Sequence, residues 1–463
     1  MNYRKTQNLS FVEGIAYNAA FILTQGFIIT GLAFQFNTTE RILAIIGVIP
    51  MISQMLQIFS PRLFKISGNR KRAMLISASI ARYSFIVIPL FLLLNLRNQY
   101  LLLMSLLIFG AFNSLTGNFW ISIMKDIIPE ERAGRFFGLR NLLISLSSMI
   151  LLYFYSILID SLGDQKGFLI VAVLGAFSSV ISRFLLGKYD DPPKKTLISG
   201  NIFSKAFKDE RFKKFLFFAF FWNFTIALAS PFFSYHQIVN LRLSYSYLSI
   251  LGFIATGVSM LFYFFWGKLA DRIGHQSIAE FSVFTASLLP SMWLFMNEHT
   301  FKILLPVDSI VGGMAWSGIN LTLFTLLLGI ADASNVEAYF AVFSFSSGSG
   351  ALLGALAGGF IASWLNLFKF ELFGMPFYGI QFLFLAGGVF RGISWLLLKQ
   401  VKTRKEISIP RYFFSTVSIL GRRAVSRPYE YAPIIAKARE SFKKRIANKK
   451  TMKVEKENQK YIL

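Results

Sequence analysis

Residues 267–274 read GKLADRIG and place a lysine, an aspartate and an arginine between two glycines. Strongly apolar sequence lies on both sides, with LGFIATGVSMLFYFFW at 251–266 and FSVFTASLLPSMWLF at 281–295. Apolar runs of this length are typical of membrane-spanning helices, and a short charged segment between two of them is typical of a loop at the membrane surface. The stretch therefore predicts two consecutive membrane spans joined by a charged loop.

The composition of the whole chain favours an integral membrane protein. The 463 residues are 54% hydrophobic and 16% aromatic, and the mean hydropathy is +0.55, which is more apolar than a soluble protein of this length. A formal net charge of +25 would suggest nucleic acid in a soluble protein, but here the charges fall in loops, so we expect no nucleic-acid partner. The absence of cysteine excludes disulfides and thiolate metal sites.

Twelve apolar stretches of about 20 residues or more, the length that crosses a bilayer, divide into two sets of six. The first set lies at about 11–35, 42–64, 72–95, 99–124, 136–161 and 167–187. The second set lies at about 215–236, 243–267, 276–296, 301–330, 336–366 and 376–399. We expect an all-α membrane protein with an N-terminal six-helix bundle (1–187), a middle loop (188–214), a C-terminal six-helix bundle (215–400) and a basic tail (401–463).

Basic residues collect in alternate connections, which predicts that those connections and both termini are cytoplasmic. These connections contain Arg4 and Lys5; Arg62, Lys65, Arg70, Lys71 and Arg72; Lys125, Arg132 and Arg135; the lysine-rich middle loop; Lys268 and Arg272; and the tail. The connection between the tenth and eleventh spans is an exception, with Asp332 and Glu337 and no basic residue. We expect a multi-pass protein of the inner (cell) membrane.

The two halves of the chain resemble each other. GAFNSLTGNFW at 110–120 matches GGMAWSGINLT at 312–322 when Gly110 is placed on Gly313, and Tyr17-Asn18 matches Trp222-Asn223 at a slightly different offset. Several weak matches in the same order at a nearly constant offset predict two related bundles. Transporters build their binding sites between such repeats, near the middle of the membrane.

In this setting GKLADRIG resembles the G-x-x-x-D-R-x-G signature of the major facilitator superfamily, in the loop between helices 8 and 9. The matching residues are Gly267, Asp271, Arg272 and Gly274. The resemblance implies that these residues help to hold the cytoplasmic side shut and release it when the cavity opens inward; the alternative is that they only cap a short loop. KDIIPEERAGRFFGLRN at 125–141 is similar to the family's loop between helices 4 and 5, so Arg135 is a second gating candidate. The first-half counterpart of the signature departs from it, because Lys65 stands where an acidic residue is expected.

The family's cavity is lined mainly by helices 1, 4, 7 and 10, and polar or aromatic residues share faces on these helices at helical spacings. Polar side chains at such depth face protein or a water-filled cavity, although they can also serve only to hold helices together. The candidates for substrate binding are Asn18, Gln25, Asn113, Trp120, Asn223, Trp316 and Asn320.

Ionisable residues inside apolar spans indicate function because they are costly to bury. Glu13, Arg82 and Asp308 are candidates for coupling, with Glu13 or Asp308 taking up a proton and Arg82 pairing with an acid or an anionic substrate. The alternative for Glu13 is that it lies close enough to the interface to extend to the membrane surface, as we expect for Arg391.

The sequence contains no Walker loop, histidine cluster or paired catalytic residues at one depth, so we expect no cofactor, metal site or enzymatic activity. The basic tail is expected to lie on anionic lipid. The resemblance implies a monomeric secondary transporter that moves a small organic solute by alternating access, with proton coupling as one option. The alternative is a transporter-shaped protein that translocates lipid, or senses a ligand without transporting a soluble solute.

Overall fold

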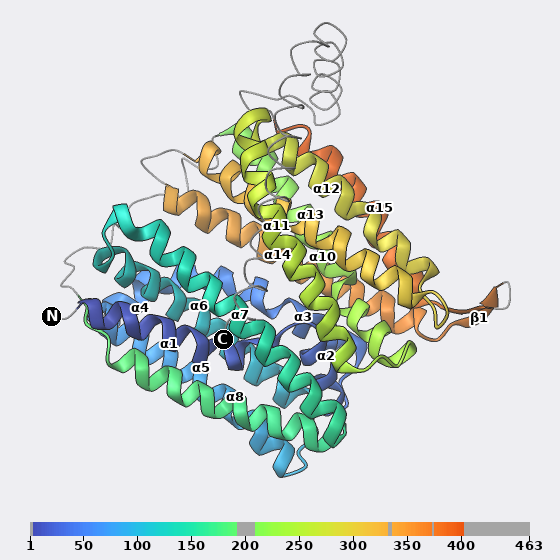
Figure 1. The fold of residues 1–463 in the computed structure, drawn as a ribbon, viewed down its shortest axis with the longest axis horizontal. Helices are drawn as coiled ribbons and strands as arrows, with labels where there is room; N and C mark the ends of the chain where they lie inside the picture. The colour runs from blue at the N-terminus through green and yellow to red at the C-terminus, as the bar shows by residue number, and fades with distance from the viewer. Residues whose placement is uncertain (1–2, 192–208, 332–335, 373–374, 402–463) are drawn as a thin grey trace, which may run out of the picture. The chain divides into compact units, whose positions relative to one another are not determined.

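A computed structural model describes residues 3–191, 209–331, 336–372 and 375–401 of the chain. The N-terminal half consists of helices connected by short turns (Figure 1). In chain order they are α1 (Tyr3–Phe21), η1 (Ile22–Thr24), α2 (Gly26–Phe34), α3 (Glu40–Met55), η2 (Leu56–Phe59), α4 (Ser60–Ser67), α5 (Arg70–Leu93), α6 (Gln99–Ile127), α7 (Glu130–Leu162) and α8 (Asp164–Gly187).

The C-terminal half repeats this helical pattern and adds one small β-hairpin. Its elements are α10 (Glu210–Tyr235), η3 (His236–Asn240), α11 (Tyr245–Ile273), α12 (His275–Met292), η4 (Trp293–Phe295), α13 (Phe301–Ile330), α14 (Val336–Leu365), β1 (Lys369–Leu372), β2 (Met375–Tyr378) and α15 (Ile380–Leu398). Of the predicted tail, 402–463 lies outside the described residues, as does 192–208 of the predicted middle loop.

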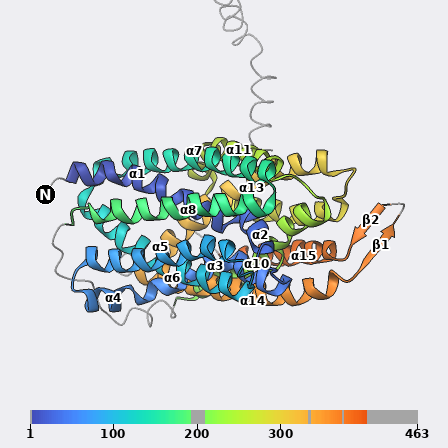
Figure 2. The ribbon, with the colours of Figure 1, turned by 90° about the horizontal axis from the view of Figure 1, so that it is seen from below.

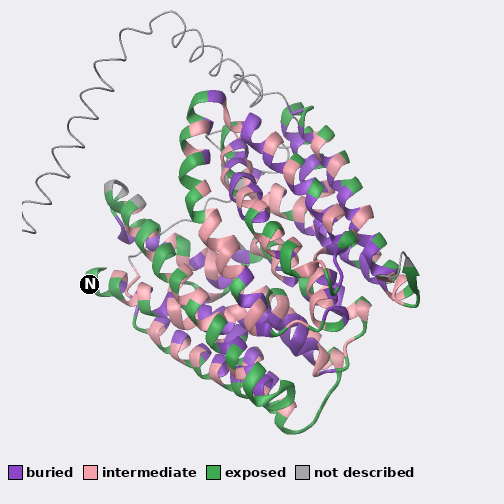
Figure 3. Cartoon of the chain, turned by 45° about the vertical axis from the view of Figure 1, so that its right-hand side comes forward, coloured by how far each residue is buried: buried purple, intermediate pink, exposed green. Residues whose placement is uncertain are grey.

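The described helices confirm the predicted all-α membrane fold. Eleven of them are long and apolar enough to cross a membrane, and there are twelve spans when the bent pair Tyr3–Thr24 and Gly26–Phe34 is counted as one. Exposed residues follow the outward sides of the helices (Figure 3), and large apolar side chains such as Leu261 and Phe264 are among them. Apolar residues on the outside suit a protein whose surroundings are lipid.

The first span differs from the unbroken helix that the sequence predicts. The two pieces meet at an angle of 56°, because Gln25 is extended and Gly26 adopts a φ of 58°. A positive φ of this size favours glycine, which has no β-carbon to clash with the backbone. The break places Gln25 at a helix end instead of inside a helix.

The last two spans also differ from expectation in how they are joined. The sequence assigned residues from 376 onward to the last helix, whereas 375–378 form strand β2, which pairs with β1 in antiparallel register, Phe370 opposite Phe377. Figure 2 shows this hairpin extending past the end of α15. We call the end of the bundles that carries the hairpin the hairpin end, and the other the opposite end.

The glycine ladder of α14 packs closely against α10. Gly350, Gly354 and Gly358 each face a backbone carbonyl of α10, and a β-carbon added at any of them would clash with it. Small residues spaced four apart let two helix backbones approach closely in a membrane protein. The ladder brings α14 and α10 into backbone contact within the C-terminal half.

The two halves of the chain meet through α3 against α14 and α7 against α11. Hydrogen bonds join them at the hairpin end: Asn366 Nδ2 donates to Glu40 Oε1 at 2.9 Å, and the backbone N–H groups of Tyr245 and Ser246 donate to the Asp160 carboxylate at 3.0 and 2.8 Å. Farther from this end, Gly348 packs against Met55. The halves are therefore fastened to each other at the hairpin end.

Candidate functional site

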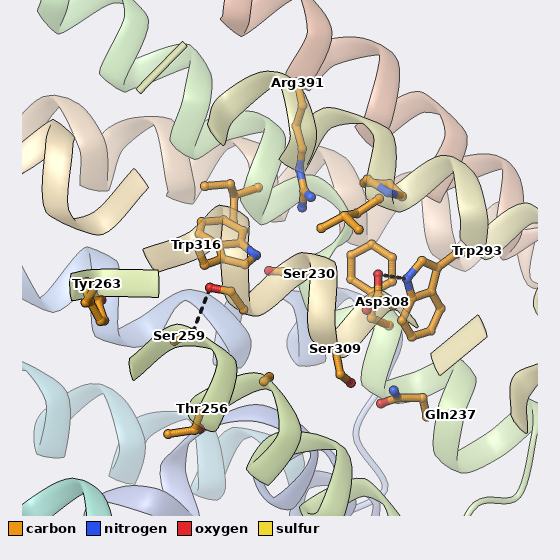
Figure 4. Close-up of a pocket in the computed structure, with 17 residues that line it drawn as sticks. Ser230, Gln237, Thr256, Ser259, Tyr263, Trp293, Asp308, Ser309, Trp316 and Arg391 are labelled. Atoms are coloured by element: carbon orange, nitrogen blue, oxygen red, sulfur yellow. Dashed lines mark hydrogen bonds between the residues drawn. The ribbon is translucent and has the colours of Figure 1, made fainter. Parts of the chain in front are cut away.

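The structure contains a cavity in each half of the chain. The larger, which we call the C-half cavity, has a volume of about 600 Å³ and is bordered by α10, α11, α12, α13 and α15 (Figure 4). The smaller, the N-half cavity, has a volume of about 350 Å³ and lies between η1, α3 and α6. Both volumes lie within or near the range of small-molecule sites in proteins.

Two opposite charges border the C-half cavity. Asp308 of α13 accepts a hydrogen bond from Trp293 Nε1 at 3.2 Å. Arg391 of α15 is only 4% exposed, and its Nη1 donates to Ala286 O at 3.4 Å. The guanidinium points into the cavity, beside the ring of Trp316 (Figure 4), whose centroid is 6.0 Å from Arg391 Cζ.

The buried position of Arg391 corrects the sequence analysis, which expected this side chain to extend to the membrane surface. Arg391 lies in the second half of the last span, from which a long arginine side chain can extend toward the headgroups. Its side chain instead crosses toward α12 and contacts the carbonyl of Ala286. Position along a helix does not reveal which side of the helix faces protein, and that side decides where the charge goes.

A cluster of buried and half-buried polar residues lies in the N-terminal half, and we call it the Glu13 cluster. Its members are Glu13, Tyr17, Arg82, Asn113, Arg140 and Ser182. The Glu13 carboxylate is 3.8 Å from nitrogen atoms of both Arg82 and Arg140, and it accepts a hydrogen bond from Ser182 Oγ at 2.8 Å. Because only 5% of its side chain is exposed, Glu13 does not extend to the membrane surface, and that alternative is wrong.

Asn113 connects the Glu13 cluster to the N-half cavity. Its Oδ1 accepts from Arg82 Nη1 at 3.1 Å, and its Nδ2 donates to the Tyr17 hydroxyl at 2.5 Å. Asn113 also lines the N-half cavity together with Gln25. A solute in that cavity would therefore contact a residue that is hydrogen-bonded to a buried arginine.

Aromatic groups surround the two arginines of the cluster. Arg82 Cζ lies 5.0 Å from the ring centroid of Tyr17, and Arg140 Cζ lies 4.1 Å from that of Trp120, so both charges face π-systems. Tyr189, just beyond α8, is fully buried. Burial, with a contribution from the Glu13 carboxylate, raises the pKa of the Tyr189 phenol well above its ordinary value, so this residue is neutral.

The other substrate candidates lie in different places. Trp316 lines the C-half cavity, and Asn18 donates to Ser148 Oγ at 2.5 Å inside the N-terminal half. Asn223 instead donates to Ala219 O of its own helix, and Asn320 is exposed. Neither Asn223 nor Asn320 lines either of the two cavities. Their helical faces turn away from these cavities, although their positions correspond to those of Asn18 and Gly117 in the repeat.

The charged signature has a different local structure from the loop that the sequence predicts. Residues Gly267 to Ile273 form the last turns of α11, and Gly274 alone separates α11 from α12, with a φ of 99°. A residue at this φ needs to be glycine, whereas Gly267 is helical and a β-carbon there would meet open space. Asp271 and Arg272 are both exposed, as is Arg135.

In the first half, the counterpart of the signature uses acids from elsewhere. Lys65 is exposed, whereas the buried Arg70 forms ion pairs with Asp126 at 2.5 Å and Asp191 at 2.7 Å. These carboxylates belong to the end of α6 and to the segment after α8. Arg70 thus joins three parts of the N-terminal half at the opposite end.

Sequence reasoning missed Tyr17, Arg140 and Ser182 in the Glu13 cluster, and Trp293 and Arg391 at the C-half cavity. Arg140 could have been found, because it is an arginine inside the apolar run at 136–161. Serine and tyrosine are common in membrane helices, so Ser182 and Tyr17 give no signal that separates them from other polar residues. Their roles depend on helices that lie far apart in the sequence.

Comparisons with known proteins agree on the type of fold. The nucleoside transporter NupG superimposes with a TM-score of 0.63 and 14% identity, over 88% of this chain and 100% of that chain. A bacterial homolog of the human lysosomal transporter Spinster, in an inward-facing and unoccupied conformation, gives a TM-score of 0.61 and 13% identity over 87% and 97% of the two chains. The human organic anion transporter MFSD10 gives 0.52 and 14% over 86% and 100%.

The family assignment comes from the sequence. No curated protein sequence shows a significant match to the chain. The family model described as Major Facilitator Superfamily matches residues 9–297, which is more than half of the chain. With its membrane-spanning helices and the fold of solved transporters, this chain belongs to the major facilitator superfamily of multi-pass membrane transporters.

Proposed function

We propose that the protein is a secondary active transporter that moves a small organic solute across the inner membrane by alternating access. Both termini are cytoplasmic in this proposal, because basic residues collect in the connections on their side. The hairpin end then faces outward. Membership of the superfamily and the transporter fold support transport as the activity.

The observation that carries the proposal is the position of the two cavities relative to the contacts between the halves. Each half contributes a cavity with buried charges in or beside it, and the hydrogen bonds that the described residues form between the halves lie at the hairpin end. With this end outward, the arrangement corresponds to the inward-facing state. Alternating access requires these contacts to break while others form at the opposite end.

Substrate binding is assigned to residues that line the cavities. Trp316 and Asp308 provide an aromatic surface and a carboxylate in the C-half cavity, and Gln25 and Asn113 provide amides in the N-half cavity. Asn18 and Trp120 are proposed to support the site indirectly, without contact with the solute. Asn18 is hydrogen-bonded to Ser148, and Trp120 lies against Arg140. Asn223 and Asn320 are not part of the proposed site.

Coupling to protons is assigned to Glu13. Its carboxylate links α1 to Arg82 of α5, Arg140 of α7 and Ser182 of α8. Protonation would remove the negative charge that lies between two guanidinium groups. The two positive charges would then repel each other and separate the helices, or they would bind an anion in place of the carboxylate. A change at Glu13 would reach the N-half cavity through Arg82 and Asn113.

Gating is assigned to Asp271, Arg272 and Arg135, the exposed charges at the opposite end. In the outward-facing state Asp271 would bind the start of α14; 332–335, which precede that helix, lie outside the described residues. The basic tail, whose proposed partner is anionic lipid, lies outside the described residues as well.

Uptake into liposomes tests the proposal. The purified chain is reconstituted, and radiolabelled sugars, amino acids, organic anions, organic cations and nucleosides are supplied with and without an inward proton gradient. We expect saturable uptake of one class, lost when Asp308 is replaced by Asn and no longer responsive to the gradient when Glu13 is replaced by Gln. Saturable binding without uptake would contradict transport and favour a ligand sensor, and a response to lipid alone would favour a lipid translocator.

A further inference from the structure

Arg391 and Asp308 place two opposite charges at one cavity without pairing with each other. Within the described part of the chain, neither side chain forms an ion pair, although both line the C-half cavity (Figure 4). Charged residues inside membrane-spanning helices are rare because they are costly to bury, and those that occur usually have a function. The separation of the two groups is therefore a property of the site that needs an explanation.

The guanidinium of Arg391 has unused donors. Its Nε is buried and has no hydrogen-bond partner, and Nη1 makes one long contact with the carbonyl of Ala286. Arginine carries five N–H donors in a fixed plane, which match a carboxylate in a two-pronged geometry. A buried arginine that points into a cavity with free donors is suited to an anionic group of a ligand.

Asp308 offers the complementary charge. One of its oxygens accepts from Trp293 Nε1, and the carboxylate keeps capacity for further donors because each ionised carboxyl has about four acceptor positions. A ligand ammonium group would satisfy it. Among the described residues that line the cavity, Arg391 is the only one with a positive charge, and those other than Arg391 and Asp308 are neutral.

The remaining wall is aromatic and apolar. Trp293, Trp316 and Tyr263 line the cavity between and beside the two charges, and Ser230 and Gln237 add small polar groups. The volume of about 600 Å³ leaves room for an apolar side chain in addition to two charged groups. The lining as a whole carries no net charge, which disfavours a ligand with a net charge.

We propose that the C-half cavity binds a zwitterionic amino acid with an apolar or aromatic side chain, whose carboxylate contacts Arg391 and whose ammonium group contacts Asp308. The assignment rests on the proposed transport function and names its substrate class. Each ligand charge replaces water at a protein charge, so removal of either ligand group leaves a buried protein charge without a partner.

A test without mutations comes first, because substitution of a buried arginine can impair folding. Binding of L-phenylalanine to the full chain in detergent is measured by calorimetry beside phenethylamine, which lacks the carboxylate, and 3-phenylpropionate, which lacks the ammonium group. We expect L-phenylalanine to bind at least tenfold more tightly than either single-charge analogue. Equal affinity for phenethylamine or for 3-phenylpropionate would overturn the proposal and indicate a cationic or an anionic substrate.

Variants then assign each charge. Arg391→Gln is expected to weaken L-phenylalanine at least tenfold and to leave the affinity for phenethylamine unchanged. Asp308→Asn is expected to weaken both L-phenylalanine and phenethylamine at least tenfold and to leave the affinity for 3-phenylpropionate unchanged. The control is Arg183→Gln, because Arg183 lies in a membrane span but is bonded to Ser79 and lines neither cavity. If Arg391→Gln binds L-phenylalanine as the unmodified chain does, Arg391 has no role in recognition and the proposal fails.

Uptake measurements in liposomes distinguish failure of this substrate assignment from failure of the proposed transport function. Binding of L-phenylalanine without its uptake would retain the site assignment and contradict transport. Saturable uptake of another class, such as nucleosides, with no binding of amino acids would retain transport and overturn the assignment of the substrate.

Discussion

The carboxylate of Asp160, at the end of α7, accepts hydrogen bonds from the backbone N–H of Tyr245 at the start of α11. Ser246 adds a second N–H at 2.8 Å and a hydroxyl contact. The carboxylate comes from one half of the chain and the helix N-terminus from the other. A negative charge at a helix N-terminus is favourable because it pairs with unsatisfied N–H groups and with the positive end of the helix dipole.

Asp160→Asn should therefore loosen the contact between the halves at the hairpin end. Hydrogen bonds to a charged group contribute about 1.5–3 kcal/mol, so the population open at this end should rise about tenfold or more. Spin labels on cysteines at the exposed Leu162 and Leu367 report the distance between the halves in this cysteine-free chain. Asp164→Asn is the control, because Asp164 begins α8 and, within the described part of the chain, no hydrogen bond joins it to α11. Identical distance distributions in the Asp160 variant and the unmodified chain would contradict the prediction.

Glu13→Gln should destabilise the fold because it leaves the buried Arg82 and the half-buried Arg140 without their common acid. Removal of one partner from a buried ion pair costs about 3–5 kcal/mol, so thermal unfolding in detergent should shift clearly downward. Adding Arg140→Gln to Glu13→Gln should restore part of the loss, since it removes one of the uncompensated charges. Strictly additive losses in the double variant would show that Glu13 and Arg140 do not interact.

Gly354→Ala should lower stability through the contact of α14 with α10. The added methyl group would meet the carbonyl oxygen and backbone of Phe224, and overpacking of this kind costs about 1–3 kcal/mol. Gly257→Ala is the matched control, because Gly257 lies within helix α11 and its β-carbon would have no neighbour within 4 Å. The control should melt at the same temperature as the unmodified chain or slightly higher. A smaller loss for Gly354→Ala than for Gly257→Ala would argue against close packing at the ladder.

The sequence could predict the spans because the thickness of the bilayer sets the length of each apolar run. The positive charges beside the runs predict which connections are cytoplasmic. Asn113 and Trp316 were predicted from faces shared at helical spacing on the fourth and tenth spans, in matching positions of the repeat, and both line cavities. Asn223 and Asn320 came from the same reasoning and line neither cavity. The repeat aligns positions along helices, but small rotations of a helix decide which side chains face a cavity.

The parts of the site that the sequence could not predict depend on contacts between distant helices. Glu13 contacts residues of α5, α7 and α8, and Arg391 contacts α12. The sequence around each residue does not show which distant helix its side chain will contact. The sequence also did not predict the break at Gly26. Glycine is frequent in membrane helices, and only the positive φ of Gly26 in the structure reveals the bend. A connection as short as 366–376 has too few residues to show the alternation of apolar and polar residues that would predict a hairpin.

The two glycines of GKLADRIG should respond differently to substitution, although the signature treats them alike. Gly274 has a φ of 99° and a ψ of 147°, a region almost restricted to glycine, so Gly274→Ala should cost about 1–3 kcal/mol through backbone strain. Gly267 is helical with open space at its β-position, so Gly267→Ala should leave the melting temperature unchanged or raise it. Both variants keep Asp271 and Arg272, which separates backbone strain from loss of charge. If Gly267→Ala lowers uptake while it preserves stability, Gly267 takes part in the packing of another state; equal loss of stability in both variants would contradict the helical assignment of Gly267.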